Sequence, residues 1–173
     1  KDSQYVNDIM VQVRYMTDTI NDFQKFIMPS SAKSVFDVSE AIETMMKIIS
    51  HTIKYNYIDV NLQKENAKNL MVKGYKNEFM QTLLNIVNNA KEQIKEAREQ
   101  KRIKRGLIAI KIYNIGKKVC IEIEDNAGGI SLEQFPKIFE AYFTTKEHGH
   151  GIGLYMSKLI IEDKMNGKIR VSN

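Results

Sequence analysis

The segment Asn77–Glu96, NEFMQTLLNIVNNAKEQIKE, has the residue pattern that decides the fold of this chain. Its apolar residues recur at helical spacing and would cover most of the helix surface, which predicts a largely buried helix. Asn85, Asn89 and Glu92 follow one another at four- and three-residue spacing, so they lie on one stripe. Because a buried amide without a partner is costly, these groups either form a hydrogen-bonded network in the core or face a polar ligand. The segment alone leaves both interpretations open.

The composition of the 173 residues, 43% hydrophobic and 27% charged, indicates one ordinary globular domain with room for an appended segment. There is no run of 18 apolar residues, so no membrane span is expected. The single cysteine, Cys120, fits a reducing compartment such as the cytoplasm. The basic run 98–105 has no aromatic residues to stack on bases, and nucleic-acid binding is therefore not expected. The sequence opens without Met, which suggests a piece of a longer protein.

Residues 3–28 predict a long helix that pairs with another helix. Their apolar residues alternate at three- and four-residue spacing, which is a heptad seam, and Pro29 ends the pattern. The other faces mix acidic residues with few basic ones, unlike a helix that lies on a membrane surface. No other segment repeats the seam, so we expect that its partner helix is missing from this chain or comes from another copy. The seam residues are Val6, Ile9, Val13, Met16, Ile20, Phe23 and Ile27.

The rest of the chain predicts helices and antiparallel strands in irregular alternation after a linker at 30–35. This order favours an α+β fold, with one sheet covered on one face by helices. An Asp37-x-x-Glu40 capping box is expected to open the first of these helices. The predicted helices are 42–55, 77–96, 131–139 and 152–164, and the predicted strands are 36–38, 58–62, 70–72, 107–113, 118–124 and 168–172.

The stretch Asp125–Ile130, DNAGGI, directly follows an apolar strand. A carboxylate at that strand end could accept hydrogen bonds from the amino group of a base, and the paired glycines would let the backbone approach a flat ligand. The alternative interpretation is a simple turn in which Asp125 acts as a cap. The stretch by itself does not decide between them.

The stretch Gly149–Leu154, GHGIGL, opens a predicted helix, where free backbone N–H groups attract phosphate. It does not follow a strand and lacks the P-loop spacing, so it is neither a dinucleotide fingerprint nor a P-loop. Phe143–Lys146, FTTK, adds hydroxyl groups and a cation just before it. The amide oxygens of the asparagine helix are hard ligands of the kind that Mg²⁺ accepts.

Taken together, the motifs resemble those of the ATP-binding domain of sensor histidine kinases, in the superfamily shared with DNA gyrase, Hsp90 and MutL. In chain order they are N-x-x-x-N-A, D-x-[GA]-x-G, F-x-x-[FY]-F-T-T-K and G-x-G-[IL]-G-L. The resemblance implies a catalytic ATP-binding domain at 36–173 with a Bergerat-type fold, a two-layer α/β sandwich with a mixed sheet. It also implies that residues 1–29 are the second helix of a dimerisation and phosphoacceptor hairpin.

The resemblance also implies roles for individual residues. Asn89 would be the Mg²⁺ ligand, Asn85 would lie beside the phosphates, and Lys146 would pair with a phosphate; these three are the expected catalytic residues. Asp125 would accept the adenine amino group, and residues 139–146 would belong to a lid. The full expected nucleotide site is Asn85, Asn89, Glu92, Asp125, Ala127, Gly129, Ile130, Phe143, Thr144, Thr145, Lys146, Gly149, His150, Gly151, Ile152, Gly153 and Leu154.

The implied function is transfer of the γ-phosphoryl group of ATP, with Mg²⁺, to a histidine upstream of the first helix and then to a response regulator. A homodimer through the N-terminal helix, a cytoplasmic location, and no direct contact with membrane or nucleic acid are expected. Two alternatives remain: an ATP-hydrolysing clamp of the same superfamily, and a nucleotide-binding module without chemistry. The clamps have a general-base Glu where this chain has Asn85, and an amide cannot act as that base. Ala127, where glycine is usual, and Ala141–Tyr142, where Pro-Phe is common, depart mildly from the pattern.

Overall fold

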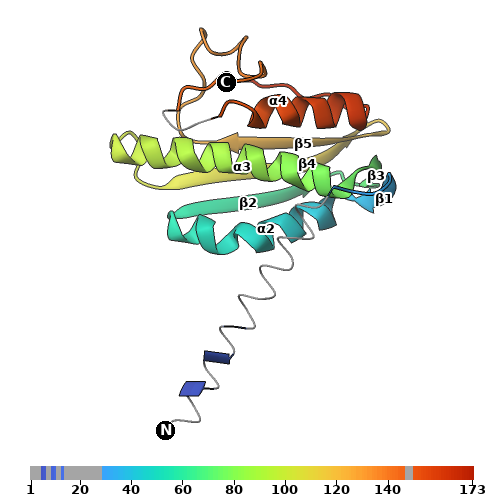
Figure 1. Cartoon of the computed structure of the whole chain (residues 1–173), viewed down its shortest axis with the longest axis horizontal. Coiled ribbons are helices and arrows are strands. Elements are labelled where there is room, and N and C mark those ends of the chain that lie inside the picture. Colours follow the sequence, from blue (N-terminus) through green and yellow to red (C-terminus); the bar gives the residue numbers. More distant parts are fainter. Residues whose placement is uncertain (1–4, 7–8, 11–12, 14–28, 147–149) are drawn as a thin grey trace.

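The structure, a computed structural model, describes residues 5–6, 9–10, 13, 29–146 and 150–173. Helices α2 (Val38–Tyr55), α3 (Lys76–Glu99) and α4 (Gly153–Lys158) lie side by side and cover one face of a sheet (Figure 1). Helix α4 continues directly as the π-helical turn η1 (Leu159–Lys164). The two-layer α+β sandwich predicted from the sequence is confirmed.

The sheet is mixed, and its strand order places β4 (Gly106–Ile115) between β2 (Ile58–Glu65) and β5 (Lys118–Asp125). Strands β4 and β5 form the predicted antiparallel hairpin, whereas β2 runs parallel to β4. A parallel pair needs a long crossover connection, and α3 lies in that crossover. A separate antiparallel pair joins β1 (Ser34–Asp37) to β3 (Met71–Gly74).

The core lies between the helices and the covered face of the sheet. On the central strand, alternate residues Ile108, Ile110 and Ile112 are at most 1% exposed, while Leu107 on the opposite face is 44% exposed. This alternation matches the two-residue period of a strand with one buried face. Helix α3 contributes a long row of buried side chains to the same core, namely Phe79, Met80, Leu83, Val87, Ala90, Ile94 and Ala97. One face of α3 is therefore fixed by apolar packing, which sets the direction of its polar stripe.

The helix predicted at 131–139 is wrong, because this segment is a series of turns. Its backbone hydrogen bonds mainly join residues three apart, as from Gln134 N to Ser131 O (3.0 Å) and from Lys137 N to Gln134 O (2.8 Å). Pro136 lies in the middle of the segment, lacks a backbone N–H, and its ring would clash with the carbonyl one helical turn earlier. A continuous helix cannot pass through that position without distortion.

The strand predicted at 168–172 is also wrong. Residues 167–173 are irregular, and within the described part of the chain they join neither sheet. The segment is instead held at its end by a side chain, because Asn173 accepts from Ile130 N (2.8 Å) and donates to Ile130 O (2.6 Å). The alternation of apolar residues alone therefore does not predict a strand here, because a strand also needs a neighbouring strand that pairs with its backbone.

The residues before β1 contact the start of α3. Ser30 N donates to both carboxylate oxygens of Glu78 (3.3 Å each), and Ser30 Oγ accepts from Asn77 N (3.2 Å). Val6 and Ile9 of the heptad seam are 59% and 61% exposed, and the seam residues Met16, Ile20, Phe23 and Ile27 lie outside the described residues. The division of the chain into 1–29, 30–35 and 36–173 stays a prediction, with β1 beginning two residues before the predicted strand.

Candidate functional site

The start of α4 meets the asparagine stripe of α3 at Asn85. The Asn85 amide donates from Nδ2 to Ser157 Oγ (3.0 Å), and Ser157 in turn donates to the Gly153 carbonyl (2.9 Å). A Cβ atom added at Gly153 would overlap the Asn85 side-chain oxygen, so the start of α4 lies directly against the Asn85 amide. Asn85 is therefore a satisfied polar group at a helix–helix contact, beside the glycine run.

One turn farther along the stripe, Asn89 and Glu92 hold the side chain of Lys146. Lys146 Nζ donates to Asn89 Oδ1 (3.1 Å) and forms an ion pair with Glu92 Oε2. The Lys146 and Glu92 side chains are 36% and 48% exposed, so this cluster faces solvent rather than the core. The groups of the stripe are hydrogen-bonded within the protein, as the network interpretation expects, and the ligand interpretation stays a prediction.

The Asp125 segment forms a tight turn at the end of β5. Asp125 is exposed, and its Oδ1 accepts from Ala127 N (2.9 Å), as in an Asx-type turn. The chain then passes through Gly128 and Gly129 at φ values of +114° and +79°, which favour glycine. The turn interpretation is thus correct for one carboxylate oxygen of Asp125. Because Asp125 is exposed, its second oxygen could accept a hydrogen bond from another group.

Three residues that sequence reasoning did not select support this turn. The Arg102 guanidinium donates to the Ala127 carbonyl, and the Asn126 side chain bridges Leu107 N (2.9 Å) and Arg105 O (3.0 Å). Asn173 holds Ile130 from the opposite side. Ser157 was also missed, although its position four residues after Gly153 puts both on one helix face. In these contacts the partners of Arg102, Asn126 and Asn173 lie between 19 and 43 residues away in sequence, so local pattern does not reveal them.

The predicted lid and glycine run meet at Gly151. Tyr142 N donates to Gly151 O (2.9 Å), and a Cβ at Gly151 would overlap the backbone of Tyr142 and Phe143. Thr144 Oγ1 accepts from Lys146 N (3.1 Å), while Thr144, Thr145, His150 and Ile152 are exposed. Leu154, in the first turn of α4, and Phe143 are half-buried. Gly149 lies outside the described residues.

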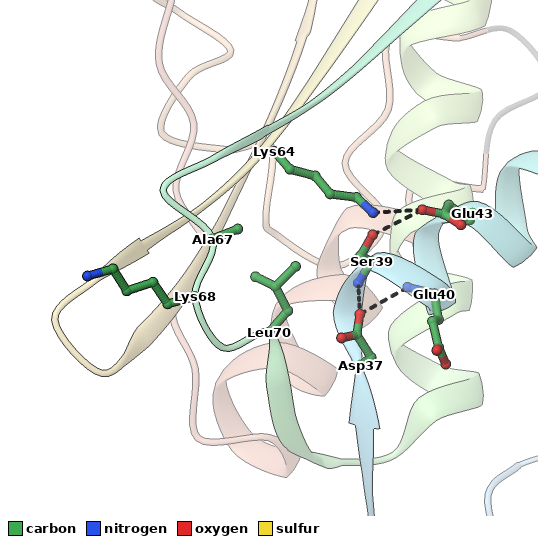
Figure 2. Close-up of a pocket in the computed structure, with 8 residues that line it drawn as sticks. All are labelled: Asp37, Ser39, Glu40, Glu43, Lys64, Ala67, Lys68 and Leu70. Carbon is green, nitrogen blue, oxygen red and sulfur yellow. Dashed lines mark hydrogen bonds and ion pairs between the residues drawn. The ribbon is translucent and has the colours of Figure 1, made fainter.

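A separate hollow lies where α2 begins, and Figure 2 shows hydrogen bonds and an ion pair that join Asp37, Ser39, Glu43 and Lys64 along its lining. Asp37 caps α2 as predicted, accepting from Ser39 N (2.7 Å) and Glu40 N (3.1 Å). The pKa of Glu43 lies below its ordinary value because Lys64 and Ser39 donate hydrogen bonds to its carboxylate. None of the motif residues lines this hollow, so we assign it a structural role; its lining is Asp37, Ser39, Glu40, Glu43, Lys64, Ala67, Lys68 and Leu70.

The donor set at the asparagine stripe fits a hard cation. Asn89 Oδ1 already accepts from a cationic group, the Lys146 ammonium, and the Glu92 carboxylate lies beside the same ammonium. Mg²⁺ prefers oxygen donors, keeps several waters and shares phosphate oxygens, so few protein ligands are needed. The described residues contain no cluster of three or more His, Cys, Asp or Glu side chains suited to holding a metal alone.

A family model described as "Histidine kinase-, DNA gyrase B-, and HSP90-like ATPase" matches residues 74–173, which is more than half of the chain. The chain therefore belongs to this family. The match includes the asparagine helix, the Asp125 turn, the lid motif and the glycine run. No helix in the described part of the chain is long and apolar enough to cross a membrane.

Among individual proteins, the chain is 28% identical over 162 residues to sporulation kinase D of Bacillus subtilis (strain 168), covering 93% of this chain and 30% of that kinase. The chain spans less than half the length of the curated relatives it matches. Among solved structures, the nucleotide-free catalytic domain of histidine kinase ThkA is similar with a TM-score of 0.71 and 30% identity, covering 82% of this chain and 87% of that one. A complex of ThkA with the response regulator protein TrrA shares the fold at a TM-score of 0.63 and 24% identity, covering 94% of this chain and 44% of that one.

The contact between Asn85 and Ser157 gives a prediction about stability. Ser157 is 1% exposed, so Ser157→Ala leaves the Asn85 amide without its acceptor and should lower the free energy of unfolding by about 1–3 kcal/mol. Urea unfolding of the chain measures this change. Ser50→Ala is a matched control, because Ser50 also donates to a carbonyl of its own helix, at Lys47, but lies in α2. Equal losses in the two variants would contradict a specific role for Ser157.

Proposed function

We propose that this chain is the ATP-binding catalytic part of a two-component sensor histidine kinase. One observation supports the proposal above the others: Lys146 of the lid motif and Gly153 of the glycine run both meet the Asn85–Asn89 stripe. Three stretches that are separated in sequence thus meet on one surface, and we assign the Asp125 turn, at the end of β5, to the same site. The kinase names of the relatives support the same class of activity.

In this proposal, Asn89 and neighbouring waters hold Mg²⁺, which would neutralise charge on the triphosphate. Asp125 binds the amino group of adenine through the carboxylate oxygen that its own turn does not use, and Gly129 lets the backbone approach the purine. Lys146 and the backbone of Gly151–Leu154 bind phosphate oxygens. Such a site would catalyse mainly through positioning and charge stabilisation, which is where phosphoryl-transfer enzymes obtain most of their rate.

Asn85 favours transfer to a protein side chain over transfer to water. Its amide donates to Ser157, and an amide nitrogen or oxygen cannot remove a proton from water at neutral pH. The position that would hold a general base in an ATP-hydrolysing clamp is therefore occupied by a structural hydrogen bond. This arrangement favours the kinase over the clamp within the same family.

The partners are proposed on the same basis. The ThkA structure in complex with TrrA supports a response regulator as the protein that receives the phosphoryl group. The exposed seam residues Val6 and Ile9 support a homodimer through residues 3–28, since an exposed heptad seam is stabilised by a second helix. We place the domain in the cytoplasm, where ATP is available and Cys120 would remain reduced.

Replacement of the proposed metal ligand gives the main functional test. Asn89→Ala should weaken Mg²⁺-dependent ATP binding by more than about tenfold, because it removes the side-chain oxygen nearest the cation. Isothermal titration with ATP in the presence and absence of Mg²⁺ measures the effect. Asn88→Ala is the control, since Asn88 lies off the stripe and accepts from Lys91 within the same helix. Comparable affinities for the two variants would rule out Asn89 as the ligand.

A second test concerns the phosphoryl acceptor. The chain incubated with γ-labelled ATP should bind nucleotide without acquiring stable label, because the proposed acceptor histidine precedes the first helix. Its histidines are His51, exposed on α2, together with His148 and His150 of the lid region. Acid-labile label mapped by mass spectrometry to any of these three would contradict the proposed location of the acceptor.

A further inference from the structure

The Lys146 ammonium occupies the part of the site where the proposed metal would bind. It lies 3.1 Å from Asn89 Oδ1, the oxygen proposed as the Mg²⁺ ligand, and it also pairs with Glu92. Asn89 and Glu92 are three residues apart on α3, so they project from one helix face as two neighbouring acceptors. Lys146 comes from a different segment, 54 residues beyond Glu92.

The ammonium and a metal ion would compete for the Asn89 oxygen. A Mg²⁺ ion bound to Asn89 Oδ1 would lie about 2.0–2.1 Å from that oxygen, and Lys146 Nζ is already 3.1 Å from the same atom. Two cations on one oxygen would also repel each other strongly. We therefore expect a metal–nucleotide complex to bind the state in which Lys146 has left Asn89.

We propose that Glu92 holds Lys146 as a place-holder cation in the nucleotide-free domain, and that magnesium nucleotide binds by displacing it. This proposal rests on the proposed function. Glu92 is then a positioning residue: it acts on Lys146 rather than on the nucleotide, and it sets how often the Asn89 oxygen is available. Once displaced, Lys146 becomes free to pair with a phosphate.

The size of the effect follows from the exposure of the pair. An ion pair between side chains that are 36% and 48% exposed is weak, so the domain alternates between held and released states. When only the released state binds ligand, the apparent affinity falls in proportion to the released fraction. Weakening the pair should raise that fraction by about two- to fivefold.

The test uses Glu92→Gln, which keeps the shape of the side chain and removes its charge. Binding of a non-hydrolysable ATP analogue with Mg²⁺, measured by isothermal titration, should become about two- to fivefold tighter. Glu96→Gln removes the same charge one turn along α3, where the Glu96 carboxylate accepts from the exposed Gln100 amide (3.0 Å), and should bind as the unmodified chain does. A Glu92→Gln variant that binds no tighter than Glu96→Gln would overturn the proposal.

A double-mutant cycle separates displacement of Lys146 from general electrostatic attraction. In a Lys146→Met background, Glu92→Gln should leave the dissociation constant unchanged, because the held state no longer exists. If the same two- to fivefold gain persists without Lys146, the gain comes from removing a negative charge near the phosphates, and the place-holder proposal is wrong.

A nucleotide-free measurement provides an independent readout. Amide hydrogen exchange over residues 142–146 should be faster in Glu92→Gln and in Lys146→Met than in Glu96→Gln, because both changes release the segment. Identical exchange in all three variants would overturn the proposal. Failure of the proposed function itself would look different: the unmodified chain would then bind no ATP analogue, whatever the exchange rates.

Discussion

The close contact between Gly153 and Asn85 is the constraint on which the rest of the site depends. Gly153 has no side chain, so the start of α4 lies directly against Asn85, and Ser157 supplies the acceptor for the Asn85 amide. A side chain at 153 would overlap the half-buried Asn85 amide, so one of the two groups would have to move. The same contact also brings the glycine run next to the asparagines, so the packing of α4 on α3 also assembles this part of the site.

Helix α3 connects this contact to the core. Its buried residues, Val87, Ala90 and Ile94 among them, pack with the isoleucines of β4 and fix the rotation of the helix. Asn85, Asn89 and Glu92 therefore lie outside the buried row of the helix. Proteins place binding groups on rigid elements of this kind because small rotations of the element would misplace every group at once. In the proposed kinase, the hydrophobic core therefore positions the groups that would bind metal and phosphate.

The sequence predicted the parts of the structure that depend on local periodicity. Helices α2 and α3 and the β4–β5 hairpin follow from residues such as Ile42, Leu83 and Ile110, whose spacing matches the element they form. The turns at 131–139 were missed because the apolar spacing was given more weight than Pro136, and the strand at 168–172 was missed because pairing is not a local property. The cluster of Lys146, Asn89 and Glu92 and the support of Asn85 by Ser157 depend on contacts 54 to 72 residues apart, which only the folded chain brings together.

The central claim is that the asparagine stripe, the Asp125 turn and the glycine run form one magnesium–nucleotide site. Backbone amide chemical shifts recorded during a titration with ATP and Mg²⁺ test it most directly, because every segment reports in one experiment. The account predicts that the largest shifts fall on residues 85–92, 125–130 and 151–154 and that they saturate together. Shifts centred instead on the hollow around Ser39 and Lys64, or confined to one of the three segments, would contradict it.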